Sequence, residues 1–92
     1  MFVLSAKLKL YIPHATSLKD KRQIRQSIIA KTRQKFNVSV AEVDTLNFYQ
    51  TLTLGVAVVS GDNKHAKQML DEIVRFIEEN TDAELTEADY AD

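Results

Sequence analysis

The chain has 92 residues, of which 45% are hydrophobic, and it contains two glycines, no cysteine and a formal net charge of −1. This length and composition indicate a single folded domain over residues 1–92 and argue against disorder. The lack of cysteine excludes disulfides, thiolate metal sites and cysteine nucleophiles. We find no signal-peptide pattern and no apolar run of membrane-spanning length, so we expect a cytoplasmic protein with no membrane partner.

The charges are divided unevenly along the chain. Residues 1–35 carry nine lysines and arginines and a single acid, a net charge of +8. Residues 36–92 carry three basic and twelve acidic residues, a net charge of −9. This division predicts a dipolar surface, with a basic patch suited to phosphate and an acidic remainder that discourages indiscriminate binding of nucleic acid.

The N-terminal segment has the pattern of a strand. Its even positions from Phe2 to Ile12 are apolar, which is the period of a strand with one buried face, and Pro13 ends the pattern.

A long basic helix is predicted next. Ser17 with Asp20 three residues later forms a capping pair, and apolar residues recur at helical spacing as far as Phe36. We expect Asn37 to end this helix in the left-handed conformation.

Two more strands follow. The apolar residues Val38, Val40, Ala41 and Val43 suggest a second strand, and their phase shifts near Ala41, which predicts a bulge there. Residues 44–50 are expected to form a turn, and the alternating segment Leu52–Val58 predicts the third strand.

The last two elements are a helix and a strand. Residues 60–62 are read as a loop that ends in a helix cap, and the helix carries apolar residues from Ala66 to Ile77. Residues 83–90 form a weaker fourth strand, with Ala83, Leu85 and Glu87 expected on one side.

The order βαββαβ predicts an α+β, ferredoxin-like fold, a four-stranded antiparallel sheet with both helices on one face. Right-handed crossovers give the strand order 4-1-3-2. The loop after the first strand, the turn at residues 44–50 and the entry to the fourth strand then lie at one end of the sheet.

Nothing in the sequence supports enzyme chemistry, and we expect no catalytic residue, cofactor or metal site. The two histidines, His14 and His65, are predicted at opposite ends of the domain, and neither glycine belongs to a phosphate-binding loop. If the protein were an enzyme after all, His14 and Asp44 would be the first acid/base pair to examine, because the topology places them at the same end.

The best local feature is the basic start of the first helix, where free backbone N–H groups favour an anion. On a helical wheel Lys19 and Arg22 lie away from the core, and Lys21 and Arg25 lie nearer the apolar sector. The competing interpretation is a solvated helix face, with these charges paired to acids elsewhere. The candidate anion- or RNA-binding residues are His14, Ser17, Lys19, Lys21, Arg22 and Arg25.

The open face of the sheet is the second candidate surface. The third strand, residues 51–60, carries no aromatic residue, so base stacking of the kind used by RRM domains is disfavoured. Its apolar residues are better suited to a second copy of the domain. The predicted homodimer face comprises Val3, Tyr11, Ala57 and Val59.

Three segments carry a family resemblance: residues 12–22 with the motif SLKDKR, residues 35–44 with FNVSVAEVD, and residues 53–60. Together they resemble the YlxP-like family, a small bacterial domain of unknown function. The resemblance implies a ferredoxin-like fold and a cytoplasmic protein often encoded near translation-initiation and ribosome-maturation genes, hence an RNA- or ribosome-related role. It supplies no catalytic assignment, but the motif makes Leu18, Asp20 and Asp44 further site candidates beside the basic residues.

Two hypotheses follow. The first is a non-enzymatic protein that binds RNA or a ribosomal particle through the basic end of the first helix. The second is a protein-interaction or small-anion-sensing domain that assembles through its open sheet face.

Overall fold

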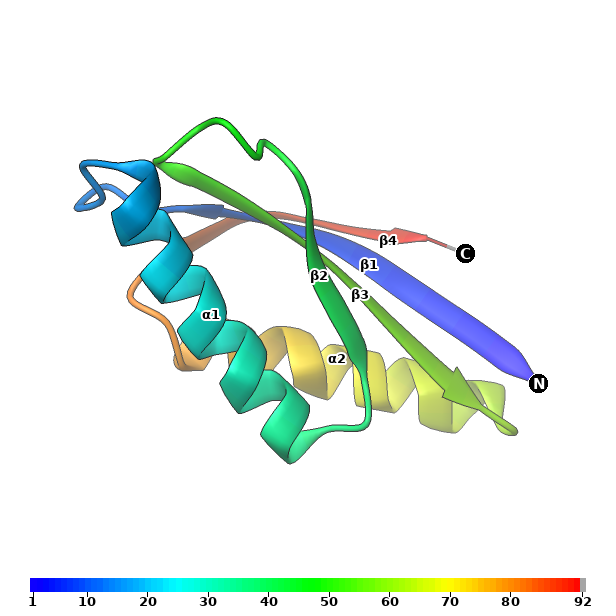
Figure 1. The fold of residues 1–92 in the computed structure, drawn as a ribbon. Helices are drawn as coiled ribbons and strands as arrows, with labels where there is room; N and C mark the ends of the chain where they lie inside the picture. Colours follow the sequence, from blue (N-terminus) through cyan, green and yellow to red (C-terminus); the bar gives the residue numbers. More distant parts are fainter. Residues whose placement is uncertain (92) are drawn as a thin grey trace.

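A computed structural model describes residues 1–91 of the chain. The elements follow the predicted order βαββαβ, and both helices cover the same face of one sheet (Figure 1). This confirms the ferredoxin-like α+β fold. The bounds are β1 Phe2–Tyr11, α1 Leu18–Lys35, β2 Ser39–Asp44, β3 Thr51–Ser60, α2 Asn63–Glu79 and β4 Glu84–Ala91.

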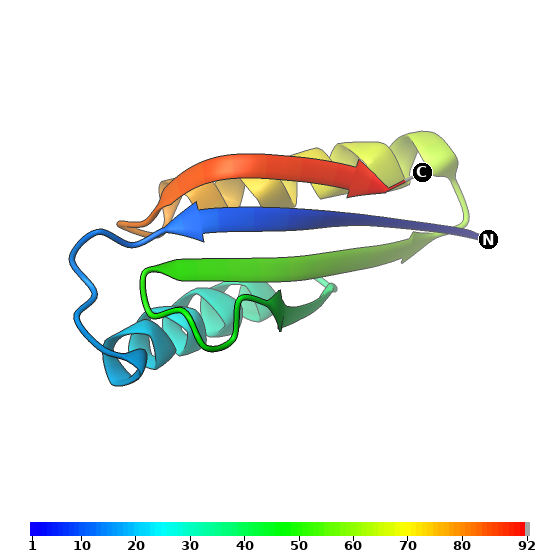
Figure 2. The ribbon, with the colours of Figure 1, turned by 90° about the horizontal axis from the view of Figure 1, so that it is seen from above.

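The sheet has the order β2-β3-β1-β4, which is the predicted 4-1-3-2 read from the other side (Figure 2). All neighbouring pairs are antiparallel. Tyr11 at the end of β1 pairs with Thr51 at the start of β3. The β1–α1 loop and the β2–β3 loop therefore lie at the same end of the sheet, as predicted.

The core lies between the sheet and the helices and follows the predicted alternation. Even-numbered residues of β1 and β3 face the helices because successive side chains of a strand point to opposite faces. Removing this apolar surface from water is the main stabilising contribution to the fold. The buried apolar residues are Ala6, Leu8, Leu10, Ile12, Ala15, Ile28, Val40, Leu52, Leu54, Val56, Val58, Ala66, Leu70, Ile73, Val74, Ile77 and Ala83.

Helix α1 is fixed at both ends. At its start, Ser17 Oγ accepts a hydrogen bond of 3.1 Å from the backbone N–H of Asp20, which confirms the predicted cap. At its end, the prediction for Asn37 is wrong: the helix stops at Phe36 in an extended conformation, φ −126°. Near this end Arg33 Nη2 donates to the carbonyl of Val40 over 2.9 Å, which ties α1 to the edge strand β2.

Two strand irregularities differ from the predicted pattern. The bulge predicted in β2 is present, but it lies between Glu42 and Asp44, just beyond Ala41, and places both Val43 and Asp44 on the open face. In β4 the register shifts between Leu85 and Glu87, so Glu87 pairs with Lys9 on the open face and does not follow Leu85 toward the core. An extra residue in one strand reverses the face of every residue after it.

Candidate functional site

The most unusual side chain of the basic cluster is Lys21, which is only 1% exposed. It lies seven residues before the buried Ile28, on the face of α1 that turns toward the sheet. Its ammonium group donates to four backbone carbonyls of the β2–β3 region. The Nζ–O distances are 2.9 Å to Thr45, 3.3 Å to Leu46, 2.7 Å to Phe48 and 3.2 Å to Thr51.

Glu42 supplies the counter-charge for this buried ammonium. Its side chain is 5% exposed, and its Oε2 lies 2.8 Å from Lys21 Nζ. That contact lies outside hydrogen-bond geometry, and among residues 1–91 no donor bonds Oε2, so the attraction is electrostatic. The other oxygen, Oε1, accepts a hydrogen bond of 2.9 Å from Arg25 Nη1. Glu42 thus neutralises part of the charge of the basic cluster.

These contacts change the predicted anion site. Lys21 must be removed from it, because a buried ammonium surrounded by five oxygens is unavailable to an external phosphate. Arg25 is partly buried and committed to Glu42. The competing interpretation, in which these charges pair internally, therefore holds for Lys21 and Arg25.

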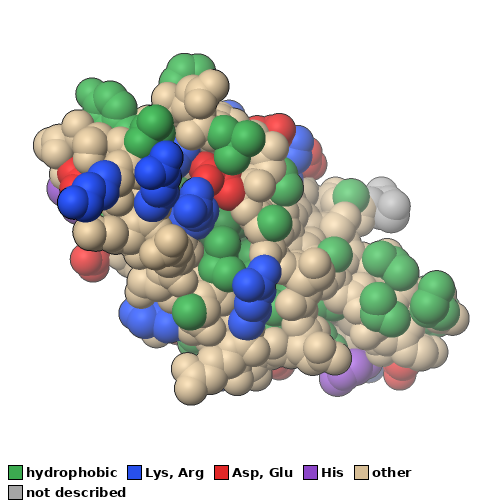
Figure 3. Space-filling view, in the orientation of Figure 1, with side chains coloured by type: hydrophobic (Ala, Val, Ile, Leu, Met, Phe, Trp, Pro, Cys, Tyr) green, Lys and Arg blue, Asp and Glu red, His purple; other side chains and the backbone are tan. Residues whose placement is uncertain are grey.

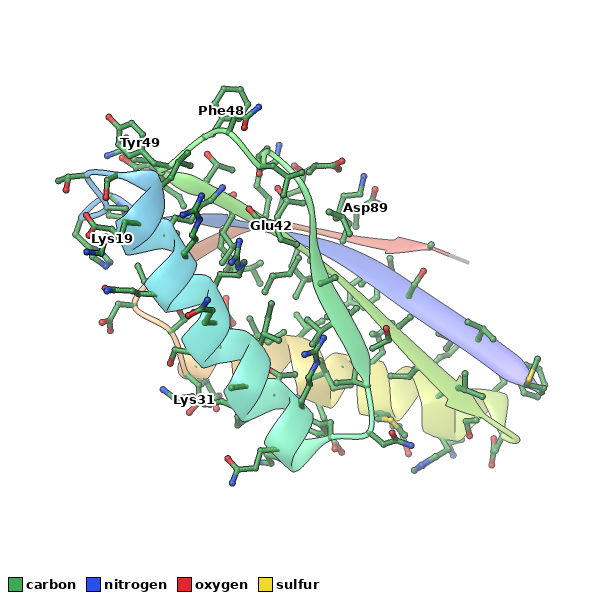
Figure 4. All side chains as sticks on the ribbon, in the orientation of Figure 1. Lys19, Lys31, Glu42, Phe48, Tyr49 and Asp89 are labelled. Carbon is green, nitrogen blue, oxygen red and sulfur yellow. The ribbon has the colours of Figure 1, made fainter. Side chains whose placement is uncertain are left out.

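The loop at residues 45–50 is shaped by the Lys21 ammonium. Because the carbonyls of Leu46 and Phe48 turn inward to meet Nζ, their side chains turn outward, and Phe48 is 64% exposed. Tyr49 is 45% exposed. In Figure 4, Phe48 and Tyr49 extend away from the body of the protein, and Glu42 lies between α1 and the sheet.

Other contacts hold the same loop at its two ends. Thr45 adopts a left-handed conformation, φ 56°, which is uncommon outside glycine. Its hydroxyl lies 2.8 Å from that of Thr53 on β3. At the other end the amide of Gln50 donates to the carbonyls of Pro13 and Ala15, over 3.2 and 3.3 Å. The loop is therefore joined to both its own strands and the β1–α1 loop.

Lys19 and Arg22 remain exposed on the outer side of α1. Within residues 1–91 neither forms an ion pair. Figure 3 shows lysine and arginine side chains gathered over the first turns of α1, with hydrophobic side chains of the neighbouring loop beside them. These two residues are the part of the predicted cluster that is free to meet a ligand.

The N-terminus of α1 is already occupied by the protein's own groups. Ser17 serves as the cap, and the Asp20 carboxylate accepts hydrogen bonds from the backbone N–H and the hydroxyl of Thr16, at 2.9 and 2.7 Å. The hydrogen bonds from Thr16 lower the pKa of Asp20. Any anion at this end must therefore be held mainly by side chains and not by the helix terminus.

His14 lies in the β1–α1 loop and faces α1. It lines a shallow groove with Lys31 of α1 and with Glu79 and Asp82 at the end of α2. Asp44 instead pairs with Lys7 on the open face of the sheet, with an Nζ–Oδ2 distance of 2.7 Å. The structure does not bring His14 and Asp44 together, so the acid/base pair considered for an enzyme is not formed.

The predicted oligomer face is interrupted. Val3 and Val59 are opposite each other in the pairing of β1 with β3 and are both exposed, and Ala57 follows on the same face. Tyr11 lies at the other end of β1. Charged pairs occupy the centre of this face, so the four residues do not form one apolar patch. Those pairs are Lys7–Asp44 at 2.7 Å and Lys9–Glu87 at 3.6 Å.

Across residues 1–91 no three histidine, aspartate or glutamate side chains gather closely enough to hold a metal ion. No helix in the same range is long and apolar enough to cross a membrane.

The exposed side chains of Leu46, Phe48 and Tyr49 were not predicted as part of a site, because residues 44–50 were expected only to form a turn. Three large hydrophobic residues in a predicted turn were a usable signal, because turns are usually built from small and polar residues. The role of Lys21 was also visible in part, since it shares the helical spacing of Ile24 and Ile28.

The family model described as "Protein of unknown function (DUF503)" matches residues 3–90. The chain belongs to this family. It is also similar to the uncharacterized protein YlxP of Bacillus subtilis (strain 168), with 31% identity over 81 residues, 88% of each chain. The resemblance found in the sequence is thereby confirmed. Neither the DUF503 family nor YlxP carries a described activity, so the function must be argued from the surface itself.

Proposed function

We propose that this protein is a non-enzymatic RNA-binding protein, associated with RNA or a ribosomal particle, that contacts phosphate through the exposed basic side of α1. The observation that carries the proposal is the freedom of Lys19 and Arg22. They remain exposed and without an ion-pair partner among residues 1–91, although two of their neighbours are committed to Glu42.

The charge distribution along the chain also favours the docking of RNA on α1. The acidic part of the chain, residues 36–92, has a net charge of −9 and would be repelled by a phosphate backbone. An approaching RNA is therefore turned toward α1, where the basic residues of positions 1–35 are concentrated. The acidic remainder limits the ways in which the RNA can dock.

A salt titration tests this proposal. The affinity for a fluorescently labelled 12-nucleotide RNA is measured by anisotropy between 50 and 200 mM KCl, for the wild type and for the Lys19→Ala/Arg22→Ala variant. Affinity should fall as salt rises, and the variant should bind more weakly with a shallower dependence, because each lost phosphate contact on a single strand removes about 0.7 from the logarithmic slope.

The matched control is Lys64→Ala/Lys67→Ala, which removes the same charge from exposed positions of α2. This control should bind nearly as tightly as the wild type. If both double variants lose affinity equally, binding follows net charge alone and the assigned surface is refuted. Failure of the wild type to bind at 50 mM KCl would refute the function itself.

A second candidate function is self-association through the open sheet face. The specific observation is the exposed pair Val3 and Val59, side by side in the register of β1 and β3. Sedimentation velocity at micromolar concentration tests it, with Val59→Lys as the variant. A dimer mass that Val59→Lys converts to a monomer supports this interface, and a wild-type monomer refutes it.

A further inference from the structure

We propose that the loop at residues 45–50 is a stacking platform for unpaired bases, so that the ligand of this surface is single-stranded RNA. The inference rests on the proposed function, which supplies the phosphate contacts. It adds a substrate class and assigns a binding role to Phe48 and Tyr49.

The aromatic rings of this loop are exposed. Phe48 is 64% exposed and Tyr49 45% exposed, on one short loop. Contiguous apolar surface left in water is unfavourable and commonly marks a site of interaction. Aromatic rings beside basic residues are the combination by which proteins bind single strands, with bases stacked on the rings and phosphates held by the charges.

The loop is also held in place by contacts within the protein, without any ligand. Four carbonyls converge on the Lys21 ammonium, and Gln50 joins the loop to the carbonyls of Pro13 and Ala15. A loop ordered in this way loses little conformational entropy on binding. Thr45 adopts a left-handed backbone conformation, which is strained for a residue other than glycine. Such strain persists only where the surrounding structure holds the backbone in place, so it also indicates a fixed loop.

The aromatic loop lies beside the basic start of α1. Lys21 stands between Lys19 and Arg22 in α1, and its own ammonium bonds the carbonyls of Leu46 and Phe48. The aromatic loop therefore adjoins the first turns of the basic helix, as Figure 4 shows for Phe48, Tyr49 and Lys19. A duplex conceals the faces of its bases within the stack, so only unpaired bases can reach these rings.

The experiment separates bases from phosphates by using three labelled ligands at one salt concentration. They are a 12-nucleotide mixed-pyrimidine RNA, a strand of the same length and charge without bases, and a 12-base-pair RNA duplex. The wild type should bind the pyrimidine strand about tenfold more tightly than the abasic strand. It should also prefer the single strand to the duplex.

Variants assign this preference to the loop. Phe48→Ala/Tyr49→Ala should remove the preference for bases and leave the affinity for the abasic strand unchanged. Phe48→Leu, which keeps an apolar side chain without a ring, should also weaken the preference. Tyr90→Ala is the control, because it removes a ring as exposed as that of Tyr49 from β4, where residue 90 pairs with Ala6 and not with the loop end of β1.

The outcomes distinguish this inference from the function on which it rests. Equal binding of the pyrimidine, abasic and duplex ligands overturns the stacking inference, as does a base preference that survives Phe48→Ala/Tyr49→Ala. Phosphate binding still stands in both cases if Lys19→Ala/Arg22→Ala remains impaired. If Lys19→Ala/Arg22→Ala binds every ligand as tightly as the wild type does, the proposed function is refuted.

Discussion

The side chain of Val43 lies directly over Gly55, so that its Cγ1 stands 2.9 Å from the position that a Cβ on residue 55 would occupy. The contact arises because the β2 bulge turns Val43 onto the open face above β3. Gly55 is therefore required by close packing and not by backbone conformation, since its φ is not positive.

Substituting Gly55→Ala should lower the free energy of unfolding by about 1–2 kcal/mol, because the added methyl group displaces the stiff Val43 side chain. The same change in a Val43→Ala background should cost less, because the obstructing methyl groups are gone. Urea denaturation of the two single variants and the double variant measures the difference. An equal loss of stability from Gly55→Ala in both backgrounds would show that the Val43 side chain does not hinder a Cβ at residue 55.

Replacing Lys21 by Met should be severely destabilising. The change leaves four carbonyls without their shared donor and deprives the buried Glu42 of one of its two cations, for which we expect a loss of about 3–5 kcal/mol. The control is Lys19→Met, an exposed position of the same helix, which should change stability by no more than about 0.5 kcal/mol. Similar urea midpoints for the two variants would contradict the structural role of Lys21.

Glu42→Gln provides a milder test of the same ion pair. It keeps the shape of the side chain but removes the charge that Lys21 and Arg25 share, so we expect a smaller loss of stability than for Lys21→Met. Hydrogen exchange of the backbone amides in residues 45–50 should rise as well, because the loop is fixed through Lys21. Unchanged exchange in this loop would count against the coupling.

Asp20 should give the protein an acid-sensitive contribution to stability. Its pKa is lowered in the fold by the hydrogen bonds from Thr16, so the stabilisation is present above the ordinary carboxyl pKa of 3.8 and is lost as pH falls through the lower folded value. The stability difference between wild type and Asp20→Asn should therefore be larger at pH 6 than at pH 2.5. A difference independent of pH would refute the assignment.

Lys7 should behave in the opposite sense. Its pKa is raised above 10.5, first by the hydrogen bond to Asp44 and then by the charge of that carboxylate. Its contribution is complete below 10.5 and is lost as pH rises through the higher folded pKa. An NMR titration should show the Lys7 pKa returning toward 10.5 in Asp44→Asn, and an unchanged titration would exclude the pair in solution.

The fold could be predicted because its signals are local and repeated. Period-2 alternation identified β1 and β3, and the caps at Ser17 and Asp62 fixed where the helices begin. Single-residue departures from a regular period were predicted less well: the β2 bulge was expected but lies beyond Ala41, and the β4 shift was not expected. The shift between Leu85 and Glu87 in β4 leaves no trace in a simple alternation, because an extra residue is visible only through its pairing partner.

The site was harder to predict, because a sequence shows which residues are charged but not whether their side chains are buried or exposed. Lys21 and Arg22 are neighbours of the same charge, yet one is buried against carbonyls and the other is exposed. The difference depends on Glu42, Leu46 and Phe48, which lie more than twenty positions away from Lys21. Only the tertiary fold brings these residues into contact with Lys21.

The hydrogen bond from Arg33 to the Val40 carbonyl has a consequence for aggregation. It occupies an acceptor of the edge strand β2, which a foreign strand would need in order to extend the sheet. The opposite edge strand, β4, carries Glu84, Glu87 and Asp89 and a register shift, and these features oppose edge-to-edge pairing with another sheet. Both edge strands therefore carry features that oppose the addition of a foreign strand.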